Sequence, residues 1–162
     1  MSSLKKEPIG ENTGERTDLA EVHARHDLTL DAARPEAVAR RRKTHQRTAR
    51  ENVEDICDPG TFVEYGPLVI AAQRRRRTVE DLIKNTPADG MVVGLGSVNG
   101  DKFPMEKSRA VLMAYDFTVL AGTQGHQNHR KTDRMIQIAT ELRLPLILFA
   151  EGGGGRPGDT DG

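Results

Sequence analysis

The chain has 162 residues, of which 36% are hydrophobic and 30% are charged, and 24 basic side chains balance 24 acidic ones. This length suits one ordinary domain, and the lack of net charge excludes strong general attraction to nucleic acid or to an anionic membrane. The longest apolar run, 144–150, is far shorter than the ~20 residues that span a bilayer, and no apolar signal core opens the chain. We therefore expect a soluble, cytoplasmic protein that binds neither nucleic acid nor membrane.

Three parts follow one another along the sequence. Residues 1–18 are polar and lack apolar periodicity, which predicts a disordered arm. Residues 19–57 are helical in pattern, and Arg34-Pro35 interrupts them because a residue before proline disfavours the helical region. Proline is accepted at a first helical position, so two or three short helices are expected. Residues 58–162 form the third part, in which strands predominate.

Strand patterns begin after the turn signal Asp58-Pro59-Gly60. The Asn99-Gly100 pair is typical of a tight hairpin turn, because both central positions of that turn need positive φ. Residues 108–122 then predict one long or two short strands. The earlier segments rich in β-branched and aromatic residues, which predict strands, are 61–66, 67–73 and 91–98.

A helix and a strand are expected next. Met135, Ile138, Ala139 and Leu142 follow the spacing i, i+3, i+4 and i+7, which is one apolar stripe of a helix. The continuous apolar run 144–150 predicts a strand buried on both faces of a sheet. Strand, helix, strand and glycine loop together indicate an α/β fold, with the loop at the carboxyl end of a strand, where ligands usually bind.

Four consecutive glycines, Gly152 to Gly155, follow that strand. A nucleotide-binding P-loop would need a lysine and a hydroxyl residue after the last glycine, and Arg156-Pro157 stand there instead. A flexible linker would mix glycine with serine and would not follow a core strand. Two interpretations stay open: a structural turn, and a loop whose backbone N–H groups approach a ligand and stabilise a negative oxygen.

Other candidate sites are weaker. The run Arg74 to Arg77 has no interleaved aromatic residues, so it is either a solvated charge run or an anion site for a small polyphosphate ligand. His126 and His129 lack a third metal ligand nearby and are expected to be ordinary residues at a helix entry, so no metal is expected. Cys57, the single cysteine, excludes an internal disulfide and is expected to be half-buried in a helix.

Several motifs in order resemble the carboxyltransferase (beta) subunits of biotin-dependent acyl-CoA carboxylases, of the acetyl- and propionyl-CoA carboxylase type. They are TARENVEDICDPGTFVEYG, PADGMVVGLGSVNG, SRAVLMAYDFTVLAGTQG and FAEGGGGRPGD, and the resemblance covers residues 22–162. It implies a crotonase-like fold, in which strand-strand-helix units form a superhelix. The sequence ends just after the loop, so we expect the truncated start of a first domain over residues 58–162, inactive by itself.

The resemblance also implies a reaction, the transfer of a carboxyl group from carboxybiotin to the α-carbon of a short-chain acyl-CoA. The backbone of Gly153, Gly154 and Gly155 would hold the enolate oxygen, and no protein side chain need act as the base. The family's Ser-Gly-Gly-Ala-Arg loop corresponds to residues 152–156, with glycine in place of serine and alanine. The residues implied as contacts for the CoA phosphates are Arg74, Arg75, Arg76, Arg77 and Lys131.

The implied partners are acyl-CoA, a biotin carboxylase and biotin carrier subunit, and further copies of the complete chain. No Met-Lys-Met attachment site is present, so biotin would arrive on a separate carrier domain. Two other functions stay open. One is a crotonase-like hydrolase or decarboxylase, which would need a carboxylate near the α-carbon. The other is a non-catalytic module that binds CoA or a partner chain.

Overall fold

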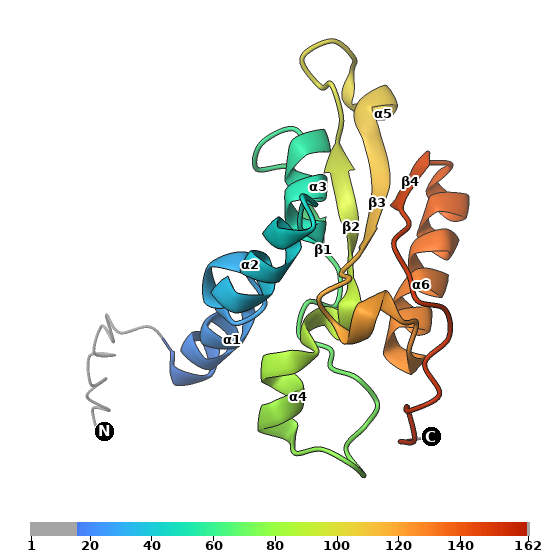
Figure 1. The fold of residues 1–162 in the computed structure, drawn as a ribbon. Helices are drawn as coiled ribbons and strands as arrows, with labels where there is room; N and C mark the ends of the chain where they lie inside the picture. The colour runs from blue at the N-terminus through green and yellow to red at the C-terminus, as the bar shows by residue number, and fades with distance from the viewer. Residues whose placement is uncertain (1–15, 162) are drawn as a thin grey trace, which may run out of the picture.

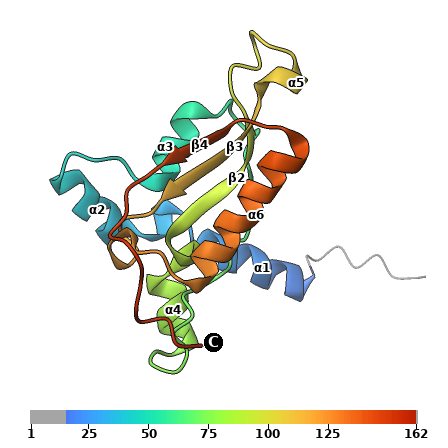
Figure 2. The same cartoon turned by 90° about the vertical axis from the view of Figure 1, so that its right-hand side faces the viewer.

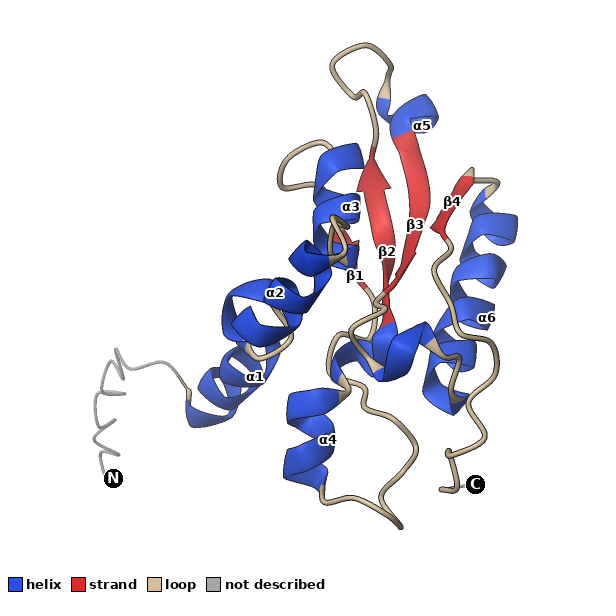
Figure 3. Ribbon diagram, viewed as in Figure 1, coloured by secondary structure: helices blue, strands red, loops and turns tan. Residues whose placement is uncertain are grey.

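A four-stranded sheet runs through residues 16–161, the part of the chain that the computed structural model describes (Figure 1). Figure 3 shows the helices of the chain in blue and the strands in red. The helices are α1 (Thr17–Asp27), α2 (Pro35–Lys43), α3 (Ala49–Ile56), α4 (Val79–Asn85), α5 (Met105–Ser108) and α6 (His126–Leu142). The strands are β1 (Val63–Glu64), β2 (Met91–Ser97), β3 (Arg109–Tyr115) and β4 (Leu146–Phe149). Short 3-10 turns occupy Asp31–Ala33, Pro87–Gly90 and Leu120–Gly122.

The strands lie side by side in chain order, β1-β2-β3-β4. β1 is antiparallel to β2 and β2 is antiparallel to β3, with Met91 of β2 opposite Tyr115 of β3. β4 returns parallel to β3 after α6, and Phe149 lies opposite Ala114. The carboxyl ends of β3 and β4 therefore meet at one edge of the sheet, where β2 begins.

The helices expected over residues 19–57 are confirmed as α1, α2 and α3. Pro35 stands at the start of α2, where its fixed φ suits the helix. Thr48 and Glu51 form a capping box on α3: the Thr48 hydroxyl accepts from the Glu51 N–H (3.1 Å) and the Glu51 carboxylate from the Thr48 N–H (2.8 Å). α1 begins at Thr17, inside the predicted arm, and residues 1–15 of that arm lie outside the described residues.

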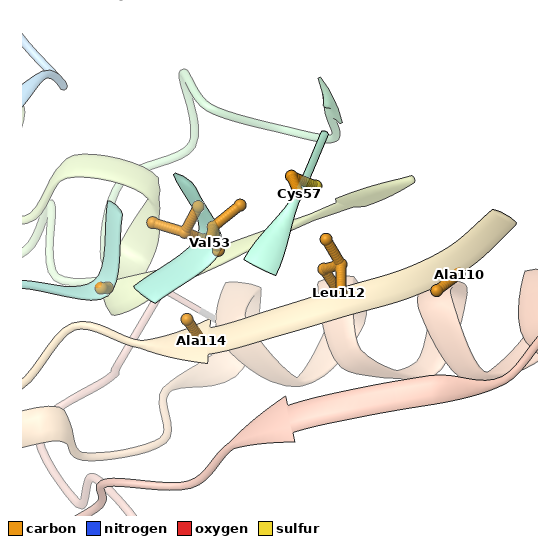
Figure 4. Packing of buried hydrophobic residues seen from close by; sticks show 7 residues of the cluster. Val53, Cys57, Ala110, Leu112 and Ala114 are labelled. Carbon is orange, nitrogen blue, oxygen red and sulfur yellow. The ribbon is translucent and has the colours of Figure 1, made fainter. Parts of the chain in front are cut away.

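α3 covers one face of the sheet and α6 covers the other (Figure 1). Leu112 of β3 packs with Val53 of α3 and with Cys57, as Figure 4 shows. Its neighbour Met113 packs on the opposite face with Met135 of α6. Both faces of β3 are thus buried, which explains its continuous apolar sequence. Cys57 directly follows α3 and is only 9% exposed, so it is more buried than expected.

The strand expected at 67–73 is absent, and this segment is irregular. Its polar backbone groups are bonded outside the sheet. The Ala71 N–H donates to the Thr86 hydroxyl (3.1 Å), and the Ala72 carbonyl accepts from the Thr160 N–H (2.8 Å). Because these partners come from a side chain and from the end of the described chain, the segment does not extend the sheet.

The tight hairpin expected at Asn99-Gly100 is also wrong, although β2 and β3 do pair antiparallel. Asn99 has a positive φ of 57°, but the Gly100 N–H donates to the Asp58 carboxylate (2.7 Å), which draws the turn toward the segment before β1. The connection runs through residues 98–108 and includes α5. Of residues 108–122, for which one long or two short strands are expected, only Arg109–Tyr115 form a strand, β3, and Leu120–Gly122 form a 3-10 turn.

β4 is present where expected, but it is not buried on both faces. Within residues 16–161 it is one of the two edge strands of the sheet, the other being β1. Leu146 and Leu148 are 38% and 45% exposed. The stripe expected on α6 is confirmed for Met135 and Ile138, which are buried.

Candidate functional site

The glycine loop leaves the sheet at the carboxyl end of β4 and lies along the segment that precedes α6 (Figure 2). Gly155 and Gln124 form an isolated parallel bridge. The Gln124 N–H donates to the Gly154 carbonyl (2.8 Å), and the Arg156 N–H donates to the Gln124 carbonyl (2.8 Å). These two hydrogen bonds hold the loop beside the carboxyl ends of β3 and β4.

The N–H groups of Gly153, Gly154 and Gly155 donate no hydrogen bond to any protein atom within residues 16–161. All three residues are exposed. Gly154 has φ +84°, a conformation that glycine adopts without strain. A Cβ on Gly153 would lie 2.9 Å from the Ala121 carbonyl oxygen, whereas a Cβ on Gly155 would meet nothing. The loop therefore presents three N–H groups that have no protein acceptor in the described part of the chain. Glycine suits position 153 because a Cβ would be too close to a carbonyl oxygen, and it suits position 154 because φ is positive.

Arg156, directly after the glycines, points into the protein instead of toward the loop surface. Its side chain is 5% exposed, and its guanidinium donates to the Thr123 carbonyl (2.7 Å) and the Thr123 hydroxyl (3.2 Å). The same group forms an ion pair with Asp89, in the turn before β2. Arg156 is consequently an anchor for the loop and is not free to bind a ligand.

Glu151 provides an anchor at the other end of the loop. Both of its carboxylate oxygens accept from the Arg41 guanidinium, at 2.8 and 2.6 Å. Arg41 is buried in α2 and also lies over the Phe117 ring, 5.6 Å from its centroid. The four glycines are thus held between two arginine–carboxylate pairs.

The arginine run, Arg74 to Arg77, lies beside residues 158–161, which follow the loop. The Asp161 carboxylate accepts from the backbone N–H groups of Arg74 (2.8 Å) and Arg75 (3.2 Å), and these hydrogen bonds are the main cause of a lowered Asp161 pKa. Arg76 donates to the Gly158 carbonyl (3.3 Å). Arg74, Arg75 and Arg76 are exposed, so two features far apart in the sequence share one region of the molecule.

Lys131 lies elsewhere, on the inner face of α6. It is 8% exposed, and its Nζ donates to the backbone carbonyls of Ala88 (3.0 Å) and Met91. Burial lowers its pKa to about 8, although Glu64 and Asp89 oppose that shift. A lysine in this position does not reach a ligand at the surface, so we exclude it from the phosphate contacts.

His126 and His129 lie in the first turn of α6, as expected for helix-entry residues. The His126 backbone N–H donates to the Asp159 carboxylate (2.7 Å). Within residues 16–161, no group of three or more histidine, cysteine, aspartate or glutamate residues could hold a metal ion. In the same range no helix is long and apolar enough to cross a bilayer.

The fold and site define an α/β domain that offers backbone donors at the carboxyl edge of a parallel strand pair. A family model described as the carboxyl transferase domain matches residues 40–160. The chain therefore belongs to the carboxyl transferase domain family.

Two similar proteins agree with this membership. The chain is 30% identical to the propionyl-CoA carboxylase beta chain of Saccharopolyspora erythraea, over 96% of this chain and 28% of that protein. It is 31% identical to the biotin-dependent long chain acyl-coenzyme A carboxylase beta4 subunit of Mycobacterium tuberculosis, over 93% of this chain and 26% of that one. The chain thus spans about a quarter of the length of these two relatives.

Solved structures share the fold. A single-chain, multi-domain long-chain acyl-CoA carboxylase matches with a TM-score of 0.86 and 61% identity, over 90% of this chain and 15% of that one. Transcarboxylase 12S matches with a TM-score of 0.72 at 23% identity, over 90% of this chain and 27% of that one. The described residues therefore adopt the fold of the corresponding part of these carboxyltransferases.

Proposed function

We propose that this chain is part of an acyl-CoA carboxyltransferase, which moves a carboxyl group from carboxybiotin to the α-carbon of an acyl-CoA. The observation that carries the proposal is the row of free N–H groups on Gly153, Gly154 and Gly155. Loss of the α-proton places negative charge on the thioester oxygen. Backbone donors held toward that oxygen stabilise the charge without any titratable side chain.

The carboxylates that flank the loop are unsuited to act as the base. Glu151 is bonded to Arg41 through both oxygens, and Asp89 is fully buried against Arg156. The Asp159 side chain is only 6% exposed, pairs with Arg156 and accepts from the His126 N–H (2.7 Å). When bound, carboxybiotin would supply the carboxyl group as carbon dioxide and then a nitrogen base for the α-proton. The chain's own part is to hold the thioester oxygen. This division of roles favours carboxyl transfer over a hydrolase or decarboxylase that uses its own carboxylate.

We assign the CoA phosphates to the exposed arginines of the run, Arg74, Arg75 and Arg76. Their position beside Gly158 and Asp161 supports this assignment, because a single ligand could contact both the run and the loop. The Arg75 side chain has no partner within residues 16–161. Arg77 is paired with Asp81 and contributes less.

The remaining features of the proposal come from the relatives. Their names include both propionyl-CoA and long-chain acyl-CoA carboxylases, so the acyl group is not restricted to short chains. A hexamer is described for transcarboxylase 12S, which supports a homo-oligomer for the complete protein. A crotonase-like fold, a separate biotin carrier, a biotin carboxylase partner and a cytoplasmic location belong to the same proposal.

The test is whether turnover depends on biotin. The complete protein that carries this segment is given methylmalonyl-CoA with and without free biotin, and loss of the carboxylate is followed. We expect decarboxylation only with biotin, and carboxylation of propionyl-CoA or palmitoyl-CoA when a carboxybiotin carrier is supplied. Biotin-independent decarboxylation or thioester hydrolysis would overturn the proposal in favour of a crotonase-like enzyme. CoA binding without any turnover would favour a non-catalytic module.

A further inference from the structure

Asp89 is a fully buried carboxylate that joins three parts of the molecule. It lies in the turn Pro87–Gly90 before β2 and is 0% exposed. One oxygen pairs with the Arg156 guanidinium, and the other accepts from the Asn128 N–H in the first turn of α6 (2.8 Å). Burial raises the pKa of the Asp89 carboxyl, and Arg156 opposes that shift. A buried carboxylate is tolerated only with such partners, so its position is closely constrained.

The backbone around Asp89 is strained, and Lys131 holds it in place. Ala88, Asp89 and Gly90 all have positive φ, at 53°, 47° and 72°, which is unusual for the first two. Lys131 donates to the carbonyls of Ala88 and Met91, on either side of Asp89. Such strain persists only where the surroundings enforce it, and it is frequent near functional sites. The turn thus fixes where the Asp89 carboxylate points.

The path from Asp89 to the glycine loop is short. Arg156 Nη1 binds Asp89 and also pairs with Asp159 (3.5 Å), and its other two nitrogens bind Thr123. Gln124 in turn binds the backbone of Gly154 and Arg156. Gly125 makes room for this arrangement, since a Cβ there would lie 2.3 Å from Arg156 Nη1. A side chain at position 125 would therefore displace the guanidinium from its present place.

We propose that Asp89 is a positioning residue for the glycine loop, acting through Arg156 to fix the direction of the N–H groups of residues 153–155. Both side chains are too buried to touch the acyl group. Donors that stabilise a developing charge must be held in place before the reaction, so a displaced loop should lower turnover more than ground-state binding. The turnover part of this inference rests on the proposed function, whereas the structural part does not.

The test compares Asp89→Asn with Asp116→Asn in the complete protein. Asp116 also forms a largely buried pair, with Arg34 at 2.7 Å, and within residues 16–161 its carboxylate accepts only from Arg34 and Thr118. Its backbone N–H donates to the Gly90 carbonyl (2.9 Å), a bond that Asp116→Asn keeps. We expect both variants to lose stability. Only Asp89→Asn should lower kcat, by about tenfold or more, with the KM for acyl-CoA changed by less than about twofold.

Hydrogen exchange and a double variant complete the experiment. Exchange should quicken for the Gln124 and Arg156 N–H groups in Asp89→Asn and not in Asp116→Asn, a result that needs no activity. Arg156→Lys keeps a cation beside Asp89 but loses the two hydrogen bonds from the guanidinium to Thr123. This variant takes the place of Asp89→Asn in the comparison if Asp89→Asn does not fold. If Asp89 acts through Arg156, the kcat of the double variant Asp89→Asn/Arg156→Lys should be no lower than that of the less active single variant. The inference would be overturned if Asp89→Asn changed neither kcat nor hydrogen exchange, or if the losses of kcat in the two single variants added up in the double variant. Unchanged kcat with faster exchange in Asp89→Asn would instead count against the proposed function.

Discussion

The glycine loop and the arginine run, which contacts Gly158 and Asp161 just after the loop, differ in how they are built. The loop has no side chains of its own from Gly152 to Gly155. The half-buried Arg41–Glu151 pair and the buried Arg156–Asp89 pair hold it. The run consists of exposed side chains, and its pair between Arg74 and Asp161 leaves the arginine 64% exposed. The proposed backbone site would therefore depend on the charged pairs at its two ends, whereas the proposed side-chain site would depend on residues that are exposed to water.

This difference predicts two kinds of mutational effect. Changes to the supports of the loop should alter stability and turnover, because buried ion pairs are costly to break from one side. Changes to the run should alter only the affinity for anions, because exposed pairs contribute little to folding.

The largest effect is expected for Arg156→Met. This change leaves the Asp89 carboxylate buried without its cation, and we expect a loss of about 3–5 kcal/mol in the free energy of unfolding. Urea denaturation measures it. The control is Arg75→Met in the run, which should stay within about 0.5 kcal/mol of the parent. Equal losses for the two variants would remove the distinction between the two regions.

A smaller and pH-dependent effect is expected at Lys131. Burial lowers its folded-state pKa to about 8; Glu64 and Asp89 raise it, and Arg50 lowers it further. The unfolded chain therefore binds more protons between about pH 8 and pH 10.5, and stability due to this group should rise with pH across that window. The neutral amine can still donate to both backbone carbonyls.

The comparison is with Lys131→Met, which keeps an unbranched side chain and cannot titrate. The stability of the parent relative to this variant should increase by on the order of 3 kcal/mol from pH 8 to pH 10.5. Denaturation at several pH values measures it. A difference that stays flat over this range would mean that the lysine is not desolvated as described.

The smallest effect is expected in the run. Replacing Arg74 and Arg76 with alanine in the complete protein should weaken CoA binding by about 1 kcal/mol, roughly fivefold, with a smaller loss for dephospho-CoA. The loss should shrink at high salt because these groups are exposed. Titration calorimetry measures both ligands. Identical losses for CoA and dephospho-CoA would make the run a solvated charge cluster.

Local patterns predicted most of the fold. The proline at the start of α2 and the apolar stripe of α6 are signals within a few residues, and both elements formed as expected. The segment 67–73 failed because its apolar residues satisfy backbone groups with Thr86 and Thr160, partners far along the chain. The turn at Asn99 failed because Asp58 competes for the Gly100 N–H. Tertiary partners overrode local propensity in both cases.

The site was predictable where its chemistry is local. The four glycines are visible as a run, but the two anchors are not. Asp89 lies in an ordinary Asp-Gly pair, and Arg41 is one of four consecutive basic residues in α2. Nothing in their neighbours distinguishes them from surface charges. Lys131 was misplaced for the same reason, since its burial depends on the carbonyls of a turn 40 residues away.

We propose that the loop acts through its backbone, and the decisive variant is Gly154→Val in the complete protein. Valine at φ +84° is strained and should turn an N–H group away from the thioester oxygen. We expect kcat to fall about a hundredfold, or ~3 kcal/mol, in protein shown to be folded, while CoA affinity hardly changes. Gly155→Ala is the matched control, because a Cβ there meets nothing, and it should be nearly silent. A folded Gly154→Val enzyme with unchanged turnover would show that the glycines are only a structural turn.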